Sequence, residues 1–178
     1  MANFATAGSQ RWLQIAVERA PELLQSALRR AGAVRRNETV TWASPRSANG
    51  FKENRDMAAL PACGLAPTIP LSQFWPARGP VWDALGRTSD GTAILVEAKA
   101  HIAEAASPGT RASEASKALI ESSLAAARRF YAPRAKAGWS GLFFQYANRL
   151  AYHYFLAHRS QLPARLVFLY FVNADDVE

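Results

Sequence analysis

Cysteine and long apolar segments are scarce in this chain, and each scarcity excludes a class of protein. The one cysteine, Cys63, cannot form an internal disulfide, which excludes a disulfide-rich secreted scaffold and favours a reducing compartment. No run approaches the ~20 apolar residues that span a bilayer, and the N-terminus lacks the charged and apolar regions of a signal peptide. We therefore expect a cytoplasmic protein that does not insert into a membrane.

Acidic residues are also in short supply. The 178 residues include 14 Asp and Glu against 21 Lys and Arg, a formal net charge of +7. This excess favours a polyanionic partner such as nucleic acid, although Arg-rich and Ala-rich sequences are often basic without one. With 49% hydrophobic and 20% charged residues, the chain is expected to fold as a single domain over residues 1–178.

Helical spacing of apolar residues marks the N-terminal part of the chain. The pattern runs from Ser9, a candidate N-cap, to Gly32, a candidate stop. Pro21 interrupts it, because proline is tolerated in a first helical turn but not inside a helix. The sequence therefore predicts either a kinked helix or two short helices that meet at Ala20.

A short strand and a proline-rich segment are expected next. Residues 38–42 alternate between polar and apolar side chains, which predicts a strand. Six of the ten prolines fall within residues 44–80. We expect this segment to be largely irregular and to run over the surface.

The second half of the chain predicts a hairpin, two helices and a last strand. Strand-like runs at 81–86 and 92–100 flank an Asp-Gly pair, a strong hairpin signal. Helices are predicted over 112–131 and, rich in aromatic residues, over 141–158. The apolar run 165–172 predicts a strand covered on both faces. This order predicts an α/β fold with a central mixed sheet flanked by helices.

Three charged residues of the hairpin stand where strand periodicity calls for core residues: Asp83, Glu97 and Lys99. Glu97 and Lys99 are two residues apart, so their side chains leave the same face of an extended strand. An ordinary ion pair on an exposed strand is the simpler explanation for such a pattern. The apolar run 94–96 directly before it favours a buried strand instead.

The hairpin register decides whether Asp83 joins the other two. A two-residue turn at Asp90-Gly91 would set Asp83 opposite Ala98 and leave the carboxylates on different faces. A three-residue loop, 89–91, with Gly91 at positive φ, would set Asp83 opposite Glu97. We predict the three-residue loop or a compensating bulge.

Two carboxylates that face each other across a hairpin repel unless a proton or a cation lies between them. Mg²⁺ prefers oxygen ligands and keeps several waters, so Asp83, Glu97 and the Ala98 carbonyl are expected to form its shell, with Mn²⁺ as a substitute. Such an ion activates water for phosphodiester hydrolysis, and Lys99 would orient that water or offset transition-state charge.

Asp83 followed, after thirteen residues, by Glu97-Ala98-Lys99 resembles the signature of the PD-(D/E)xK nuclease superfamily, which has the restriction-endonuclease-like fold. The predicted element order is similar to the αβββαβ core of that fold and covers most of the chain. The proline of the signature is displaced, because Trp82 precedes Asp83 and the nearest proline is Pro80. The resemblance implies Mg²⁺ dependence and a nucleic-acid substrate, DNA more than RNA.

The resemblance also implies further site residues. Many members add an acidic residue from the first helix, for which Glu18 is the candidate and Glu22 the alternative. Some carry a glutamine on the helix after the hairpin. Gln145 fits that position, and Asn148 and Arg149 share its helical face, although a packing cluster explains them equally well. His101 and Glu104 follow the signature closely enough to line the site.

Three functions compete at this point. The leading hypothesis is an Mg²⁺-dependent nuclease, and the alternative is a nucleic-acid-binding or assembly module of the same fold without turnover. A third is an interaction protein that forms a homodimer through the aromatic helix at 143–155. The chain stops soon after its last predicted strand, so we expect either a chain shortened at its C-terminus or a partner that covers this strand.

Overall fold

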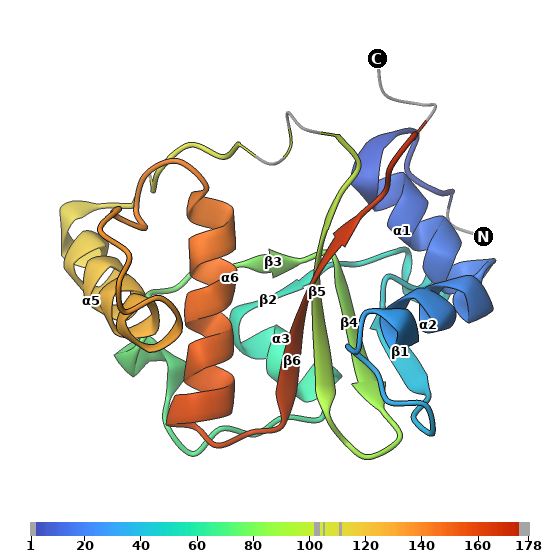
Figure 1. The fold of residues 1–178 in the computed structure, drawn as a ribbon, viewed down its shortest axis with the longest axis horizontal. Coiled ribbons are helices and arrows are strands. Elements are labelled where there is room, and N and C mark those ends of the chain that lie inside the picture. Colours follow the sequence, from blue (N-terminus) through green and yellow to red (C-terminus); the bar gives the residue numbers. More distant parts are fainter. Residues whose placement is uncertain (1–2, 102–103, 105, 111, 175–178) are drawn as a thin grey trace.

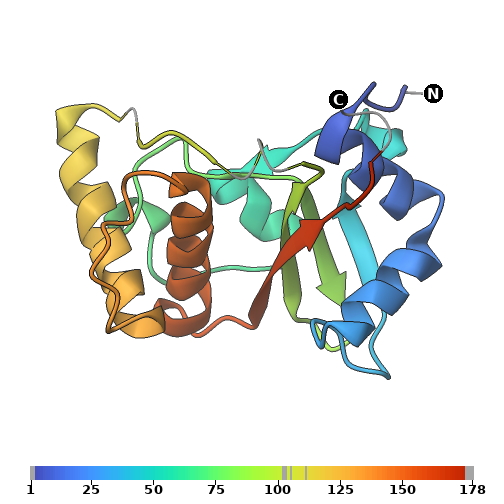
Figure 2. The same ribbon diagram turned by 45° about the horizontal axis from the view of Figure 1, so that its top comes forward.

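The computed structural model describes residues 3–101, 104, 106–110 and 112–174. They form a mixed α/β fold in which a four-stranded mixed sheet lies between two groups of helices (Figure 1). Figure 2 shows these two groups on opposite sides of the sheet. Within the described ranges, no helix combines the length and the apolar character needed to cross a bilayer.

The N-terminal segment forms two helices, α1 (Gly8–Glu18) and α2 (Pro21–Arg30). Pro21 is the first residue of α2, where its missing N–H costs no helical hydrogen bond. This confirms the two-helix outcome. The prediction of Ser9 as N-cap is wrong, because α1 begins one residue earlier and Ala7 occupies the cap position.

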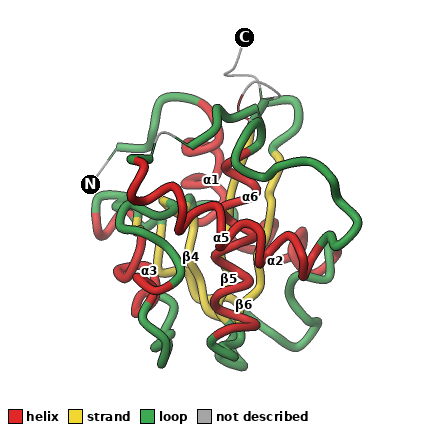
Figure 3. The backbone as a smooth tube through the Cα atoms, turned by 90° about the vertical axis from the view of Figure 1, so that its left-hand side faces the viewer, coloured by secondary structure: helices red, strands yellow, loops and turns green. Residues whose placement is uncertain are grey.

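The main sheet has the strand order β1-β4-β5-β6. Its first three strands, β1 (Val40–Ser44), β4 (Ala84–Thr88) and β5 (Ala93–Lys99), are antiparallel neighbours. The last strand, β6 (Ala164–Tyr170), runs parallel to β5. Figure 3 shows the strands of this sheet side by side behind the helices that face the viewer.

β6 differs from the prediction of a strand covered on both faces. It is an edge strand, its side chains are mostly half-buried, and Tyr170 at its end is exposed. A continuous apolar run does not distinguish an edge strand from a central one, which explains the error. Arg165 near the start of β6 donates to both carboxylate oxygens of the buried Glu38, at 2.6 and 3.0 Å.

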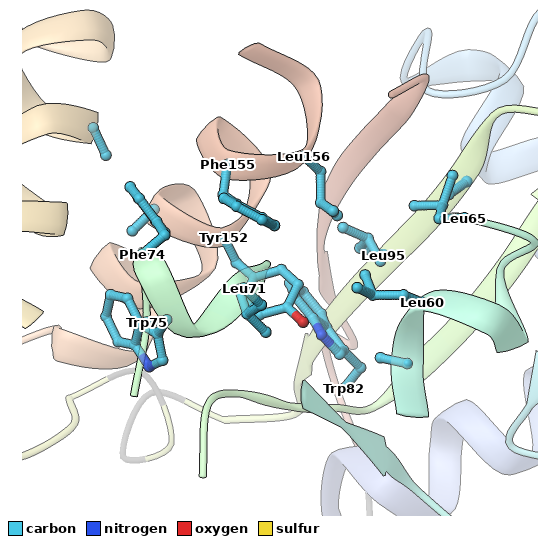
Figure 4. Packing of buried hydrophobic residues seen from close by; sticks show 14 of the residues in the cluster. Leu60, Leu65, Leu71, Phe74, Trp75, Trp82, Leu95, Tyr152, Phe155 and Leu156 are labelled. Carbon is cyan, nitrogen blue, oxygen red and sulfur yellow. The ribbon is translucent and has the colours of Figure 1, made fainter. Parts of the chain in front are cut away.

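The proline-rich segment 44–80 is largely irregular, with several short elements. It contains two 3₁₀ turns (Ser47–Asn49 and Leu71–Gln73), the short strand β2 (Asn54–Arg55) and helix α3 (Asp56–Ala62). The prediction that it runs over the surface is wrong, because apolar residues between the prolines enter the core (Figure 4). These buried residues are Leu60, Cys63, Leu65, Leu71, Phe74 and Trp75.

A predicted single strand, 81–86, is divided in two at Asp83. Val81 and Trp82 form β3, which pairs with β2 in a separate two-stranded sheet, whereas β4 belongs to the main sheet. Trp82 is fully buried and meets Tyr152 edge to face, with ring centroids 5.6 Å apart (Figure 4). The backbone on the N-terminal side of Asp83 is therefore anchored in the core.

Two helices, α5 (Glu114–Tyr131) and α6 (Phe144–Tyr154), cover one face of the sheet, and α6 continues into a π-helical segment, Phe155–Arg159. Tyr152 on α6 is fully buried, whereas Phe143 before it is exposed. Most of the aromatic helix thus packs within the protein, and a homodimer through it stays a prediction.

β5 divides the core by strand alternation. Ile94 and Val96 pack against α1 and α2, and Leu95 packs against the layer of α3, α5 and α6. Because side chains two apart share a face, Glu97 and Lys99 continue the row of Leu95 toward α6. Every residue of β5 is buried, so these two charges lie inside the protein.

Candidate active site

The hairpin has the predicted three-residue loop. Ala84 pairs with Val96, and the Thr88 N–H donates to the Thr92 carbonyl at 2.8 Å. Gly91 takes a φ of +90°, which a residue with a side chain rarely adopts. The register prediction is therefore confirmed: continued by one residue, it places Asp83 opposite Glu97.

Asp83 is half-buried at the break between β3 and β4. Its Oδ2 atom accepts a hydrogen bond from the Ala98 N–H at 2.7 Å. Burial and the charge of Glu97 raise the pKa of Asp83 to about 7, against the opposing effects of the Ala98 N–H, Arg149 and Lys99. Near neutral pH this carboxyl group can therefore exchange a proton.

Glu97 is only 2% exposed, and both of its oxygens are paired. Oε1 lies 2.5 Å from the Lys99 ammonium, itself buried. Oε2 accepts from Arg149, at 2.8 Å from Nε and 2.6 Å from Nη2. With Asp83 ionised, the four groups carry two negative and two positive charges, so the cluster is neutral.

Arg149 on α6 connects the cluster to its surroundings. It donates to the Val81 carbonyl at 2.7 Å and to the Asn148 side-chain oxygen at 2.8 Å. Its guanidinium also lies over the Trp82 ring, 5.2 Å from the centroid. The sequence placed Arg149 on the face of Gln145 but did not identify it as the partner of Glu97.

These groups open onto a cleft of about 380 Å³. Among the residues that line it are Asp83, Glu97, Lys99, Glu104, Gln145 and Arg149. The cleft is therefore largely polar, and it brings the three charged residues predicted from the hairpin together with residues of α6.

Gln145 is the additional candidate that joins this cleft, and its backbone N–H donates to the buried Ser107 hydroxyl at 2.9 Å. Glu104, which was expected together with His101 to line the site, does line the cleft, whereas Ser107 was not predicted. Glu104 accepts from the Ala100 N–H at 2.7 Å. Its closeness to the Glu-x-Lys signature was the one sequence signal available for it.

The other candidates lie elsewhere. Glu18 pairs with Arg46 at 2.7 Å and accepts from the Ser47 hydroxyl at 2.8 Å, so it is bound to the segment after β1 and does not line the cleft. Glu22 is exposed in the first turn of α2. His101 is exposed at the surface, 3.6 Å from Glu104, and does not line the cleft.

The donor set for a metal ion consists of two carboxylates and one carbonyl. In the described part of the chain, no group of three or more His, Cys, Asp and Glu side chains could hold a metal. The N–H and C=O of a strand residue point to the same edge, so the Ala98 carbonyl faces the side of Asp83. No described residue donates to Oδ1 of Asp83. These oxygens fit Mg²⁺, which is commonly bound through one or two carboxylates and several waters.

Comparisons with protein-family models, curated proteins and solved structures found no match to this chain.

Proposed function

We propose that this protein is a divergent Mg²⁺-dependent nuclease with a restriction-endonuclease-like fold. One observation carries the proposal: Asp83 directly precedes the Ala84–Val96 pair of the hairpin, and Asp83, Glu97 and Lys99 line one polar cleft. The order of helices, antiparallel β1-β4-β5 and parallel β6 supports the αβββαβ core of that fold. The substrate is a phosphodiester of DNA or RNA, and the resemblance favours DNA.

The roles follow from position. Asp83, Glu97 and the Ala98 carbonyl hold the ion, with Mn²⁺ as a substitute for Mg²⁺. When bound, the ion supplies a polarised phosphate oxygen and a water of lowered pKa. Lys99, fixed by Glu97, presents an ammonium at the cleft wall, where it offsets the negative charge that grows on the phosphate. The net charge of +7 attracts a polyanionic substrate to the protein.

Cleavage assays test the proposal. Single-stranded and double-stranded DNA and RNA are incubated with the protein in Mg²⁺, Mn²⁺ or EDTA. We expect cleavage in either metal and none in EDTA, and we expect Asp83→Asn and Lys99→Ala to abolish it while sparing nucleic-acid binding. Cleavage that resists EDTA or survives in Lys99→Ala would contradict the mechanism.

Matched controls come from an exposed ion pair on α5. Glu114 and Lys117 lie 3.6 Å apart, with side chains 90% and 44% exposed. Glu114→Gln and Lys117→Ala remove the same charges as the site variants but lie outside the cleft. Both controls are expected to cleave like the wild type, which separates loss of the site from loss of charge.

The pairing of Arg149 with Glu97 favours a second candidate function, a nucleic-acid-binding or assembly module without turnover. Arg149 neutralises the Glu97 carboxylate, which would otherwise attract a metal ion. Under this alternative the protein binds nucleic acid equally well in Mg²⁺ and in EDTA, and no substrate is cleaved. Measurable Mg²⁺-dependent turnover in the wild type excludes it.

A further inference from the structure

A second hollow, of about 450 Å³, adjoins the cleft on the other side of α6. The residues that matter for its chemistry are Trp75, Arg78, Gly79, Ser116, Phe144 and Asn148. Side chains four apart share one helical face. The first turns of α6 therefore present Phe144 and Asn148 to this hollow, and Gln145 and Arg149 to the cleft.

Aromatic side chains form one wall of the hollow. The rings of Trp75 and Phe144 are stacked, with centroids 6.5 Å apart and planes inclined by 28°. Trp75 is almost fully buried and Phe144 is half-buried, so the pair is fixed on one side and accessible on the other. Such a wall suits a flat aromatic ligand.

Arg78 and Gly79 form the part of the wall next to Trp75, and Asp56 holds their backbone. The Asp56 carboxylate accepts the Arg78 N–H at 3.0 Å and also the Gly79 N–H. A Cβ atom at position 79 would lie 2.6 Å from Asp56 Oδ1, so only glycine fits there without a shift. The shape of the hollow is thus held by named contacts before any ligand enters.

Asn148 gives the hollow a directed hydrogen-bond donor. The residue is 8% exposed, and its Oδ1 atom accepts from Arg149 at 2.8 Å. An arginine only donates hydrogen bonds, so the oxygen must face Arg149 and the amide nitrogen is left for the hollow. No described residue accepts from that nitrogen. A carbonyl oxygen or a ring nitrogen of a ligand would accept a hydrogen bond from this amide nitrogen.

We propose that this hollow binds one unpaired nucleobase of the substrate, next to the phosphodiester held in the cleft. The inference rests on the proposed function, because it assumes a nucleic-acid substrate. A planar base packs against the Phe144 wall and accepts a hydrogen bond from the Asn148 amide. Arg149 joins Asn148 to Glu97, so the base and the reacting phosphate are positioned by one side chain. The substrate is single-stranded, or has one nucleotide turned out of the stack.

Binding to abasic oligonucleotides tests this inference without turnover. Short fluorescein-labelled single strands of DNA, each lacking the base at one position, are titrated with the protein in EDTA and followed by anisotropy. We expect one abasic position to weaken binding to the wild type about tenfold, the loss typical of one base–aromatic contact. No sensitive position in the wild type would overturn the inference.

Three variants assign that loss to the hollow. Phe144→Ala removes the wall, and Ser116→Phe fills the space from α5, so both are expected to bind intact and abasic strands equally. Phe143→Ala is the control, because Phe143 is exposed and lines neither hollow. It should keep the tenfold difference. Circular dichroism identifies any variant that does not fold.

Binding and cleavage results separate the two proposals. If the abasic penalty is present in the wild type and lost in each of the variants Phe144→Ala and Ser116→Phe that folds, the base site stands even when no substrate is cleaved. If a folded variant of either kind keeps the wild-type penalty, the base site is refuted, whatever the cleavage assays give.

Discussion

Arg149 holds the Oε2 atom of Glu97 through two nitrogens, at 2.8 and 2.6 Å, from a helix 52 residues further along the chain. A buried carboxylate on a central strand thus receives part of its compensating charge from α6. The charge of Glu97 and the position of α6 are therefore coupled. If α6 moved away, Glu97 would lose Arg149, and if Glu97 lost its charge, Arg149 would lose its partner.

Loss of Arg149 should destabilise the protein. Arg149→Met leaves Glu97 buried with Lys99 as its remaining partner, and breaking one side of a buried pair costs on the order of 3 kcal/mol. Urea unfolding measures this loss. Adding both Glu97→Gln and Lys99→Met to Arg149→Met should recover part of it, because the charges of the remaining buried pair are then gone together. A single variant as stable as the wild type would contradict the pairing.

Asp83 should make stability depend on pH. Its pKa is about 7 in the folded protein against an ordinary value of 3.8, so the folded state holds this proton more tightly than the unfolded state. The stabilising contribution is complete below the ordinary pKa and is lost as the pH rises through about 7. Asp83→Asn removes this loss and should be more stable than the wild type above neutral pH.

Thermal unfolding across this pH range tests the Asp83 prediction. The advantage of Asp83→Asn over the wild type should shrink as the pH falls toward the ordinary carboxyl pKa. Glu114→Gln, at the exposed carboxylate of α5, should show no comparable trend. An advantage of Asp83→Asn that does not vary with pH would rule out the raised pKa as its cause.

Metal binding should follow the same ionisation. A divalent cation needs Asp83 as a carboxylate, so binding displaces a proton below the Asp83 pKa of about 7. Mn²⁺ affinity, measured by electron paramagnetic resonance, should rise with pH and level off above that value. Asp83→Asn should bind weakly at every pH, and Glu114→Gln should match the wild type. Equal affinity at acidic and neutral pH would argue against Asp83 as a ligand.

Gly91 should tolerate alanine poorly. At a φ of +90° a side chain is strained, and its Cβ would lie 3.2 Å from the Arg87 guanidinium. Gly91→Ala should therefore lower the free energy of unfolding by about 1 kcal/mol. Gly138→Ala is the matched control, because a Cβ there meets nothing within 4 Å and its φ is not positive. Equal stabilities of the two variants would show that the loop does not require glycine.

The part of the site that sequence could predict is local. Glu97 and Lys99 share a face because they are two residues apart on a strand. The Asp-Gly pair indicates the turn, and the turn sets the register that brings Asp83 near them. The break between α1 and α2 was predictable for the same reason, since Pro21 fixes the backbone of its own turn.

The rest depends on tertiary packing. Nothing near Arg149 in the chain indicates that it meets Glu97, and Glu18 was assigned to the site by analogy, although the fold directs it to Arg46. The prolines of residues 44–80 suggested surface structure. However, the leucines and aromatic residues between them gain more by burial than the irregular backbone loses.

The pairing of β3 with β2 gives the proline-rich segment a part in positioning Asp83. Trp82, directly before Asp83, pairs with Asn54, so the backbone that leads into Asp83 belongs to the two-stranded sheet and not to the main sheet. If residues 46–60 were replaced by a short linker, β3 would lose its partner strand β2. The backbone before Asp83 would then no longer be held in place. A stretch that looks dispensable by composition is therefore structural support for the proposed metal ligand, and it also contributes Glu53 to the lining of the cleft.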